Sequence, residues 1–327
     1  MEYRRLGGSG LKVSALSFGA WVTFSNQLDI GHAVEIMGSA YDSGVNFFDN
    51  AEAYAQGEAE RIMGRALEKL AWPRDSYLVS SKVMFGSVQD PQPTQLGLSR
   101  KHVMEACDQA LDRMRVDYLD LYLCHRPDKE VPILETVWAM SDLVQMGKVH
   151  YWGTSEWSAK ELKEAHAVAK EWRLIAPTTE QSEYNMFHRE RVEVEYSDLY
   201  DSLGLGVTAY SPLASGVLTG KYNNGIPKDS RMNLPGYEWL LQSLTSEEGQ
   251  AQIAKVGQLE VVAKELGISM AQLALAWCLR NPNVSTVITG ATKSDQLKEN
   301  LEALEAVALL TDEIMHRIED ILAKRPL

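Results

Sequence analysis

The sequence has few of the features that mark several large classes of protein. Its 327 residues hold three cysteines, Cys107, Cys124 and Cys278, too few and too far apart for a disulfide framework or a CxxC metal site. The formal net charge of −13 disfavours nucleic acid and anionic membrane surfaces as partners. The first residues have no apolar run typical of a signal peptide. We therefore expect a cytoplasmic protein with reduced cysteines, no metal and no membrane insertion.

Two kinds of nucleotide-binding motif are also missing. No GxGxxG follows a predicted strand and no Walker sequence occurs, so neither a Rossmann site nor a P-loop is predicted. A catalytic thiol at Cys124, next to His125, remains an alternative to the commoner role of buried cysteine as a small hydrophobe.

What the sequence does contain is a regular alternation of short apolar runs with longer amphipathic segments. Hydrophobic residues make up 45% of the chain and no linker divides it, which indicates one domain over residues 1–327. Residues 103–114, for example, place their apolar side chains on one helical face. Eight such units predict an α/β fold, a (β/α)₈ barrel. The predicted strands are residues 16–18, 45–48, 77–80, 118–123, 149–153, 178–181, 206–209 and 285–288.

Three segments fall outside this repeat. Residues 3–6 and 12–15, joined by GGSG, predict a β-hairpin that plugs the bottom of the barrel. Residues 221–249 show no clear period and are expected to form a long surface loop on the active face. Residues 311–324 predict an additional C-terminal helix with a Thr-Asp-Glu start signal.

Polar side chains follow three consecutive predicted strands. Asp49 ends the second strand and Tyr54 lies five residues later, Lys82 follows the third, and His125 follows the fourth. Because catalysis in this architecture occurs at the carboxyl ends of the strands, we expect these four residues to meet on one rim.

The four residue types suit acid chemistry on a carbonyl group. A phenol has a pKa of about 10, and a buried lysine could lower that of Tyr54 by roughly 3 units, which requires about 4 kcal/mol. Asp49 is then needed to keep the buried Lys82 charged. His125 could donate a hydrogen bond to the carbonyl oxygen. Singly, each residue could equally be structural.

Several long motifs resemble those of the aldo-keto reductase superfamily over essentially the whole chain. Residues 44–54 (GVNFFDNAEAY), with GEAE at 57–60 and GRAL at 64–67, are similar to the family's Asp/Tyr signature. Residues 119–128 (LDLYLCHRPD) are similar to its strand-four motif. The branch most resembled is that of potassium-channel β-subunits and their bacterial relatives, through WVTF at 21–24, YNMF at 184–187, SPLASG at 211–216 and GKY at 220–222.

The resemblance implies an NADPH-dependent reductase of aldehydes or ketones, with Asp49, Tyr54, Lys82 and His125 as its catalytic residues. Animal channel subunits have Asn at the position of His125, so this chain carries the set expected of a working enzyme. The alternative is an NADP(H)-binding regulatory subunit with slow turnover, a tetramer if it assembles like the channel subunits. A glycosidase using Asp49 with Glu52, Glu58 or Glu180 is a further alternative, disfavoured because Lys82 would lower the pKa of Asp49.

The resemblance also implies a cofactor lying across the top of the barrel. Residues 287–296 lead from a strand through Gly290 into a helix N-terminus beside Lys293, a natural anion site for the 2′-phosphate. Glu156 departs from the family, which often has a basic residue there. The adenosine end would be held by Thr292, Lys293, Gln296, Glu299 and Asn300. Ser155 and Gln181 would hold the carboxamide, and Tyr210 would stack on the nicotinamide ring. The pyrophosphate region would be held by Ser211, Leu213, Ser215, Lys221, Ser230 and Arg231. The other residues expected to bind the cofactor are Trp21, Thr23, Asp49, Pro212, Ala214, Gly216 and Gly290.

The substrate pocket is predicted from the loops and aromatic residues at the same rim. The loops around residues 84–98 and 222–249 are expected to determine specificity. The predicted lining is Trp21, Tyr54, Phe85, His125 and Tyr237.

Overall fold

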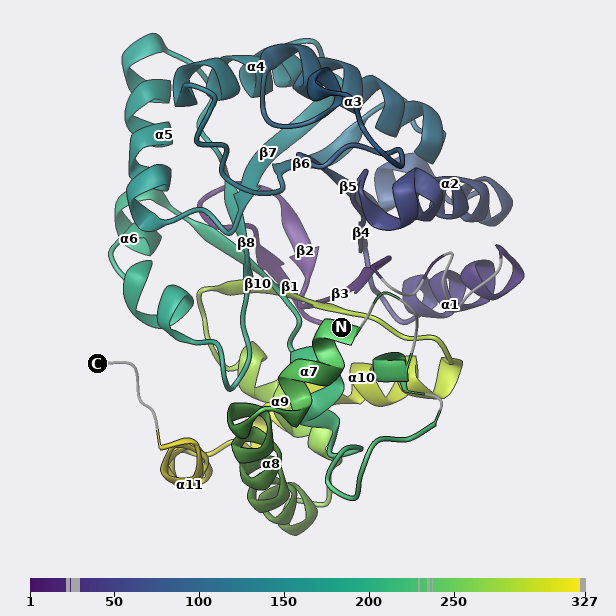
Figure 1. Cartoon of the computed structure of the whole chain (residues 1–327), viewed down its shortest axis with the longest axis vertical. Coiled ribbons are helices and arrows are strands. Elements are labelled where there is room, and N and C mark those ends of the chain that lie inside the picture. Colours follow the sequence, from purple (N-terminus) through teal and green to yellow (C-terminus); the bar gives the residue numbers. More distant parts are fainter. Residues whose placement is uncertain (22–23, 25–29, 229, 234–235, 237, 324–327) are drawn as a thin grey trace.

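The centre of the fold is a closed barrel of eight parallel strands (Figure 1). The computed structural model describes residues 1–21, 24, 30–228, 230–233, 236 and 238–323. The strands follow one another around the barrel in chain order, and the last one pairs with the first to close it. All eight predicted strands and the predicted (β/α)₈ fold are confirmed. The barrel strands are β3 (Leu16–Gly19), β4 (Phe47–Asp49), β5 (Leu78–Val83), β6 (Leu119–Cys124), β7 (Val149–Ser155), β8 (Thr179–Glu183), β9 (Gly206–Tyr210) and β10 (Val284–Thr289).

Helices surround the barrel and bury its outer face (Figure 1). The predicted helix at residues 103–114 forms the greater part of one of them, which Ser99 caps by accepting a hydrogen bond from the His102 amide. Strands covered on both faces need continuous apolar runs, which explains their composition. The surrounding helices are α1 (Ile30–Asp42), α2 (Glu58–Leu70), α3 (Arg100–Met114), α4 (Ile133–Gln145), α5 (Ala159–Trp172), α6 (Leu199–Leu203), α9 (Met270–Leu279) and α10 (Ser294–Ala306).

The predicted N-terminal hairpin is present and closes the bottom of the barrel. Strands β1 (Tyr3–Arg5) and β2 (Lys12–Ser14) pair antiparallel, and the fully buried Leu6 at their turn packs with Leu121 and Leu123 inside the barrel. The Gly8 amide also donates a 2.7 Å hydrogen bond to the Gly204 carbonyl, just before β9 begins. The hairpin thus leaves the opposite end, where the strands finish, open for chemistry.

The prediction of a long loop at residues 221–249 was wrong in part. A short helix, α7 (Glu238–Thr245), lies within it, and α8 (Glu247–Glu265) begins before its end. Leu240 and Leu244 stand one turn apart on α7 and are both buried, so tertiary packing stabilises a helix of two turns. The helix was not predicted because its apolar periodicity covers only two turns and follows a proline and a glycine, which are typical of loops.

The chain ends in the predicted additional helix. Helix α11 (Asp312–Leu322) is capped by Thr311, whose side chain accepts a hydrogen bond from the Ile314 amide. The helix ends two residues before the predicted end at residue 324, which lies outside the described residues. Among the described residues, no single helix is long and apolar enough to span a membrane. Helices α8 and α9 satisfy the length and composition criteria as a pair, but they are bent by 89° relative to each other.

Candidate active site

The four predicted rim residues come together at the carboxyl ends of neighbouring strands. Asp49 is the last residue of β4, Lys82 lies near the end of β5, and His125 directly follows β6. Tyr54 begins the short 3₁₀ helix η1 (Tyr54–Gly57) in the loop after β4. Parallel strands deliver their carboxyl ends to one rim, so the chain order of these residues becomes a spatial cluster.

The Lys82 ammonium is fully buried and has three acceptors. Its Nζ atom donates hydrogen bonds to Asp49 Oδ2 at 2.7 Å, to the Asn50 carbonyl at 2.8 Å and to Tyr54 Oη at 3.1 Å. An ammonium has three donors and no lone pair, so all its protons are used. The Tyr54 oxygen must therefore be the acceptor in this contact, which leaves the phenolic hydrogen free for another partner.

Asp49 is itself held by two further donors. Its Oδ1 atom accepts from Ser80 Oγ at 2.8 Å and from Gln181 Nε2 at 3.1 Å. Burial by itself would lower the pKa of Lys82, but the charge of Asp49 and the contact with Tyr54 outweigh it and raise that pKa above its ordinary value. Lys82 is therefore charged throughout the neutral range.

The loop that carries Tyr54 has an unusual backbone. Ala55, Gln56 and Gly57 all have positive φ angles, of 47°, 56° and 82°. A side chain at Gly57 would also bring its Cβ within 2.9 Å of Arg113 Cδ. Consecutive left-handed residues cost free energy and persist where the surroundings impose them, here in the turn that holds the Tyr54 ring beside Lys82.

The expected lowering of the Tyr54 pKa is not what the structure gives. Burial raises the pKa of Tyr54 by more than the nearby Lys82 charge lowers it, so its pKa lies above the ordinary value of 10. The sequence argument included the cation but not the full desolvation of the phenol. At neutral pH Tyr54 therefore holds its proton and can act as a donor.

His125 lies edge-on to two aromatic rings. Its ring centroid is 5.8 Å from that of Tyr54 and 5.2 Å from that of Phe85. Burial, followed by the charges of Lys82 and Arg126, holds the pKa of His125 well below its usual range. Its buried Nδ1 atom has no hydrogen-bond partner among the described residues. The imidazole is thus neutral and able to donate one hydrogen bond.

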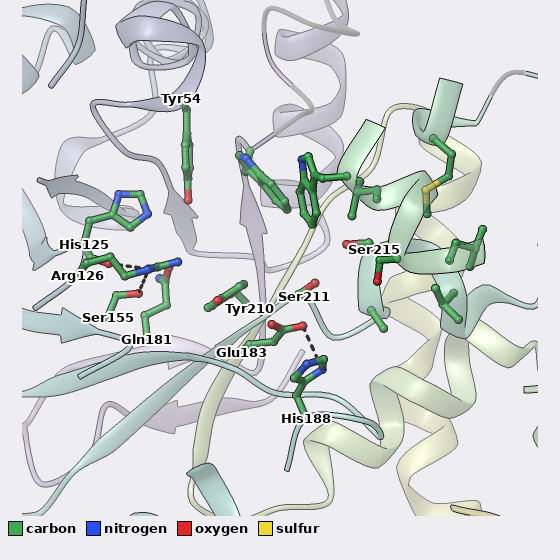
Figure 2. A pocket seen from close by; sticks show the side chains of 18 of the residues that line it. Tyr54, His125, Arg126, Ser155, Gln181, Glu183, His188, Tyr210, Ser211 and Ser215 are labelled. Atoms are coloured by element: carbon green, nitrogen blue, oxygen red, sulfur yellow. Dashed lines mark hydrogen bonds and ion pairs between the residues drawn. The ribbon is translucent and has the colours of Figure 1, made fainter. Parts of the chain in front are cut away.

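Two cavities meet at this cluster, and both are lined by Tyr54, Trp21, Gln181 and Tyr210. The first, of about 560 Å³, includes His125 and reaches toward α7 (Figure 2). The second, of about 800 Å³, runs from Asp49 to the start of α10. Tyr54 thus stands where the contents of the two cavities would touch.

Most residues predicted to bind a cofactor line the second cavity. Ser155 and Ala214 line the first cavity instead, and Phe85 lies beside His125, 45% exposed, without lining either. Thr23, Tyr237 and the side chain of Arg231 lie outside the described part of the chain. The predicted residues in the second cavity are Trp21, Asp49, Gln181, Tyr210, Ser211, Pro212, Leu213, Ser215, Gly216, Lys221, Ser230, Gly290, Thr292, Lys293, Gln296, Glu299 and Asn300.

The second cavity has two places suited to anions. Ser211, Ala214 and Ser215 adopt positive φ angles of 54°, 45° and 55°, a conformation that is rare for such residues and that occurs in backbone sites for anions. At the far end, α10 begins without a side-chain cap at the exposed Lys293, leaving its first amides open. The phosphate groups of an extended dinucleotide would fit these features.

Several residues of the first cavity were not predicted. Arg126, Glu183 and His188 place charged or titratable groups there, and α7 adds Trp239 and Leu240. Arg126 could have been suspected, because it directly follows His125 in the same motif. The α7 residues could not, since their helix was not predicted.

The carboxylate of Glu156 is bound by other protein groups and is not available to a cofactor. Its backbone has a φ of +60°, and its carboxylate accepts a 2.7 Å hydrogen bond from the Glu183 amide and pairs with Arg191 at 2.5 Å. The missing basic residue is therefore replaced by an acid that joins β8 to the segment after it.

The carboxylates weighed for a glycosidase do not face Asp49. Glu52 accepts hydrogen bonds from the amides of Met84 and Gly86, and Glu58 pairs with Arg61 at the surface. Glu180 precedes Gln181 on β8 and so projects to the opposite face of the strand. These contacts argue against that alternative.

A catalytic thiol at Cys124 is also unsupported. The side chain is fully buried, and burial raises its pKa far above that of an ordinary thiol. A thiol that stays protonated is a poor nucleophile.

Comparison with known proteins agrees with this arrangement. The family model described as aldo/keto reductase family matches residues 15–323, so the chain belongs to that family, whose members generally bind NAD(P)H and act as oxidoreductases. Two plant proteins, from Arabidopsis thaliana and Oryza sativa subsp. japonica, are each 51% identical over 328 residues, covering 100% of this chain and 98% of their own length. Both are named "Probable voltage-gated potassium channel subunit beta".

The depressed pKa of His125 predicts a pH-dependent stability. Below about pH 6.5 the unfolded chain binds a proton that the folded site resists, so the unfolding free energy falls as the pH falls, by about 1.4 kcal/mol per unit. Denaturant unfolding between pH 7.5 and 5 should show a shallower fall in His125→Gln than in the natural protein. An equal slope in both proteins would contradict the lowered pKa of His125. The control is His150→Gln, which replaces an exposed histidine.

Proposed function

We propose that this protein reduces aldehydes or ketones to alcohols with NADPH as the reductant and Tyr54 as the proton donor. The observation that carries the proposal is the buried Asp49, Lys82 and Tyr54 chain at the junction of two cavities. One cavity has anion-binding ends that suit a dinucleotide, and the other can hold a carbonyl compound against Tyr54.

The reaction divides between the cofactor and the protein. NADPH, when bound, supplies the hydride that forms the new C–H bond at the carbonyl carbon. Tyr54 gives its free phenolic proton to the carbonyl oxygen, completing the alcohol. Lys82 already donates to the Tyr54 oxygen and stabilises the phenolate left behind, while Asp49 keeps Lys82 charged.

His125 orients the substrate in this proposal. The neutral imidazole donates a hydrogen bond to the carbonyl oxygen, which stabilises negative charge as it develops there. Its position edge-on to Tyr54 and Phe85 brings an aromatic wall to the same point. Trp21, which lines the first cavity, would contact the apolar part of the substrate.

The cofactor would lie along the second cavity. Gln181, and Ser155 from the adjoining wall of the first cavity, would hold the carboxamide. Tyr210 would stack on the nicotinamide ring, and the strained backbone at residues 211–216 would hold the pyrophosphate. Lys293 at the start of α10 would bind the 2′-phosphate, which gives the preference for NADPH over NADH.

A second function is favoured by the names of the two plant relatives. In that case the protein binds NADP(H) with slow turnover as a regulatory subunit of a potassium channel. It would assemble as a tetramer. His125 favours the enzyme, because a subunit without turnover does not need a donor to the carbonyl oxygen. A cytoplasmic location suits both functions.

Replacing Tyr54 with Phe tests the proton donor. The substitution removes only the hydroxyl, so kcat/KM for 4-nitrobenzaldehyde should fall by about 10² to 10⁴ while NADPH affinity stays nearly unchanged. The readouts are loss of absorbance at 340 nm and NADPH fluorescence. Tyr3→Phe, at an exposed tyrosine of the hairpin, is the matched control. Undiminished turnover in Tyr54→Phe would refute the role, and tight NADPH binding with no turnover in the natural protein would favour the regulatory function.

Replacing Lys293 with Ala tests the 2′-phosphate site. The dissociation constant for NADPH should rise by about tenfold or more, because a charge-assisted hydrogen bond is lost, while that for NADH should hardly change. Lys298→Ala removes an equally exposed lysine from the same helix and serves as the control. Equal weakening of both nucleotides would show that Lys293 does not recognise the 2′-phosphate.

A further inference from the structure

Arg126 places a guanidinium in the cavity where the substrate would bind. It follows His125 directly and lines the first cavity together with Tyr54 and His125, but it does not line the second cavity. Figure 2 shows its side chain extending beneath the His125 ring. The group therefore lies in the cavity that also holds His125, next to Ser155, which the carboxamide of the proposed cofactor would contact.

The guanidinium is bound by neutral acceptors alone among the described residues. Its Nη1 atom donates to the His125 carbonyl at 2.6 Å and to Ser155 Oγ at 3.2 Å, and no carboxylate lies within 4.0 Å to form an ion pair. Arginine has five N–H donors, and these two bonds both use Nη1. The remaining donors, on Nη2 and Nε, have no acceptor among the described residues and can reach a ligand in the cavity.

The acid that could neutralise Arg126 is engaged elsewhere. Glu183 lines the same cavity, but its Oε1 atom lies 3.4 Å from His188 Nδ1 and accepts from Asn185 Nδ2 at 3.2 Å. Figure 2 shows this carboxylate turned toward His188. Glu183 thus has its own partners, and although the charges of Glu183 and Arg126 interact, the two side chains form no ion pair.

Such an arginine can bind an anion in the cavity. A partly buried guanidinium is normally paired, and its planar fork matches a carboxylate in bidentate geometry. The protein as a whole carries a net charge of −13 and would repel anions, so recognition of one requires a local cation of this kind. The adjacent positions of His125 and Arg126 put the carbonyl and carboxylate sites next to each other.

We infer that the substrates are oxo acids, that is, aldehydes or ketones that also carry a carboxylate, and that Arg126 binds this carboxylate while Tyr54 and His125 face the carbonyl. The inference rests on the proposed reductase function. It assigns Arg126 to substrate selection, a task separate from the proton transfer at Tyr54.

Two aldehydes of the same shape test the inference. 4-Carboxybenzaldehyde carries the charge, and 4-formylbenzamide replaces it with a neutral planar amide. The natural protein should show a higher kcat/KM for the acid than for the amide. In Arg126→Met this ratio should fall about 10- to 100-fold, mainly through KM for the acid, and Arg126→Lys should be intermediate because a point charge lacks the fork.

The control and the opposing outcomes separate the two proposals. Arg317→Met removes one positive charge from α11, far along the chain from the site, and should leave the ratio unchanged. A natural protein that reduces the amide as well as the acid, or an Arg126→Met variant that loses both equally, overturns the oxo-acid inference and leaves the reductase standing. A natural protein that binds NADPH and reduces neither aldehyde overturns both. If Arg126→Met does not fold, as judged by its thermal unfolding, the natural ratio and Arg126→Lys still decide.

Discussion

The buried ion pair between Lys82 and Asp49 is the interaction on which the site depends. Taking an ammonium out of water costs several kcal/mol, and the cost is offset here because each of its three protons has an acceptor. Asp49 is in turn fixed by Ser80 and Gln181, which come from β5 and β8. Loss of Lys82 or of Asp49 would leave the other charge buried and unpaired, so the barrel rim and the reactive group are stabilised by the same contacts.

This pair also sets the direction of the hydrogen bond at Tyr54. Because Lys82 can only donate, Tyr54 accepts from it and presents its own proton to the cavity. Burial keeps that proton in place at neutral pH, and the lysine charge limits the cost of releasing it. The phenol is thus a stable acid that gives up its proton when a carbonyl oxygen gains negative charge.

Much of this arrangement could be predicted from local sequence. The strands are short apolar runs with clear ends, so the polar residues that follow them could be placed on one rim. Helix α7 was missed because two turns carry little periodic signal. Its leucines are buried as part of the hydrophobic core, which the local sequence does not show. The pKa of Tyr54 and the unpaired state of Arg126 depend on burial and on distances between segments far apart in sequence, which no local pattern contains.

The most direct test of this account is the pH dependence of kcat/KM for 4-nitrobenzaldehyde with NADPH. Tyr54 must be protonated and Lys82 charged, and both pKa values are raised above their ordinary values of 10.0 and 10.5. The account predicts a plateau from pH 6.5 to about 10 and a loss of activity above it, because the donor then loses its proton. A rate that falls between pH 7 and 9 would contradict it, since the proton would then come from a different group.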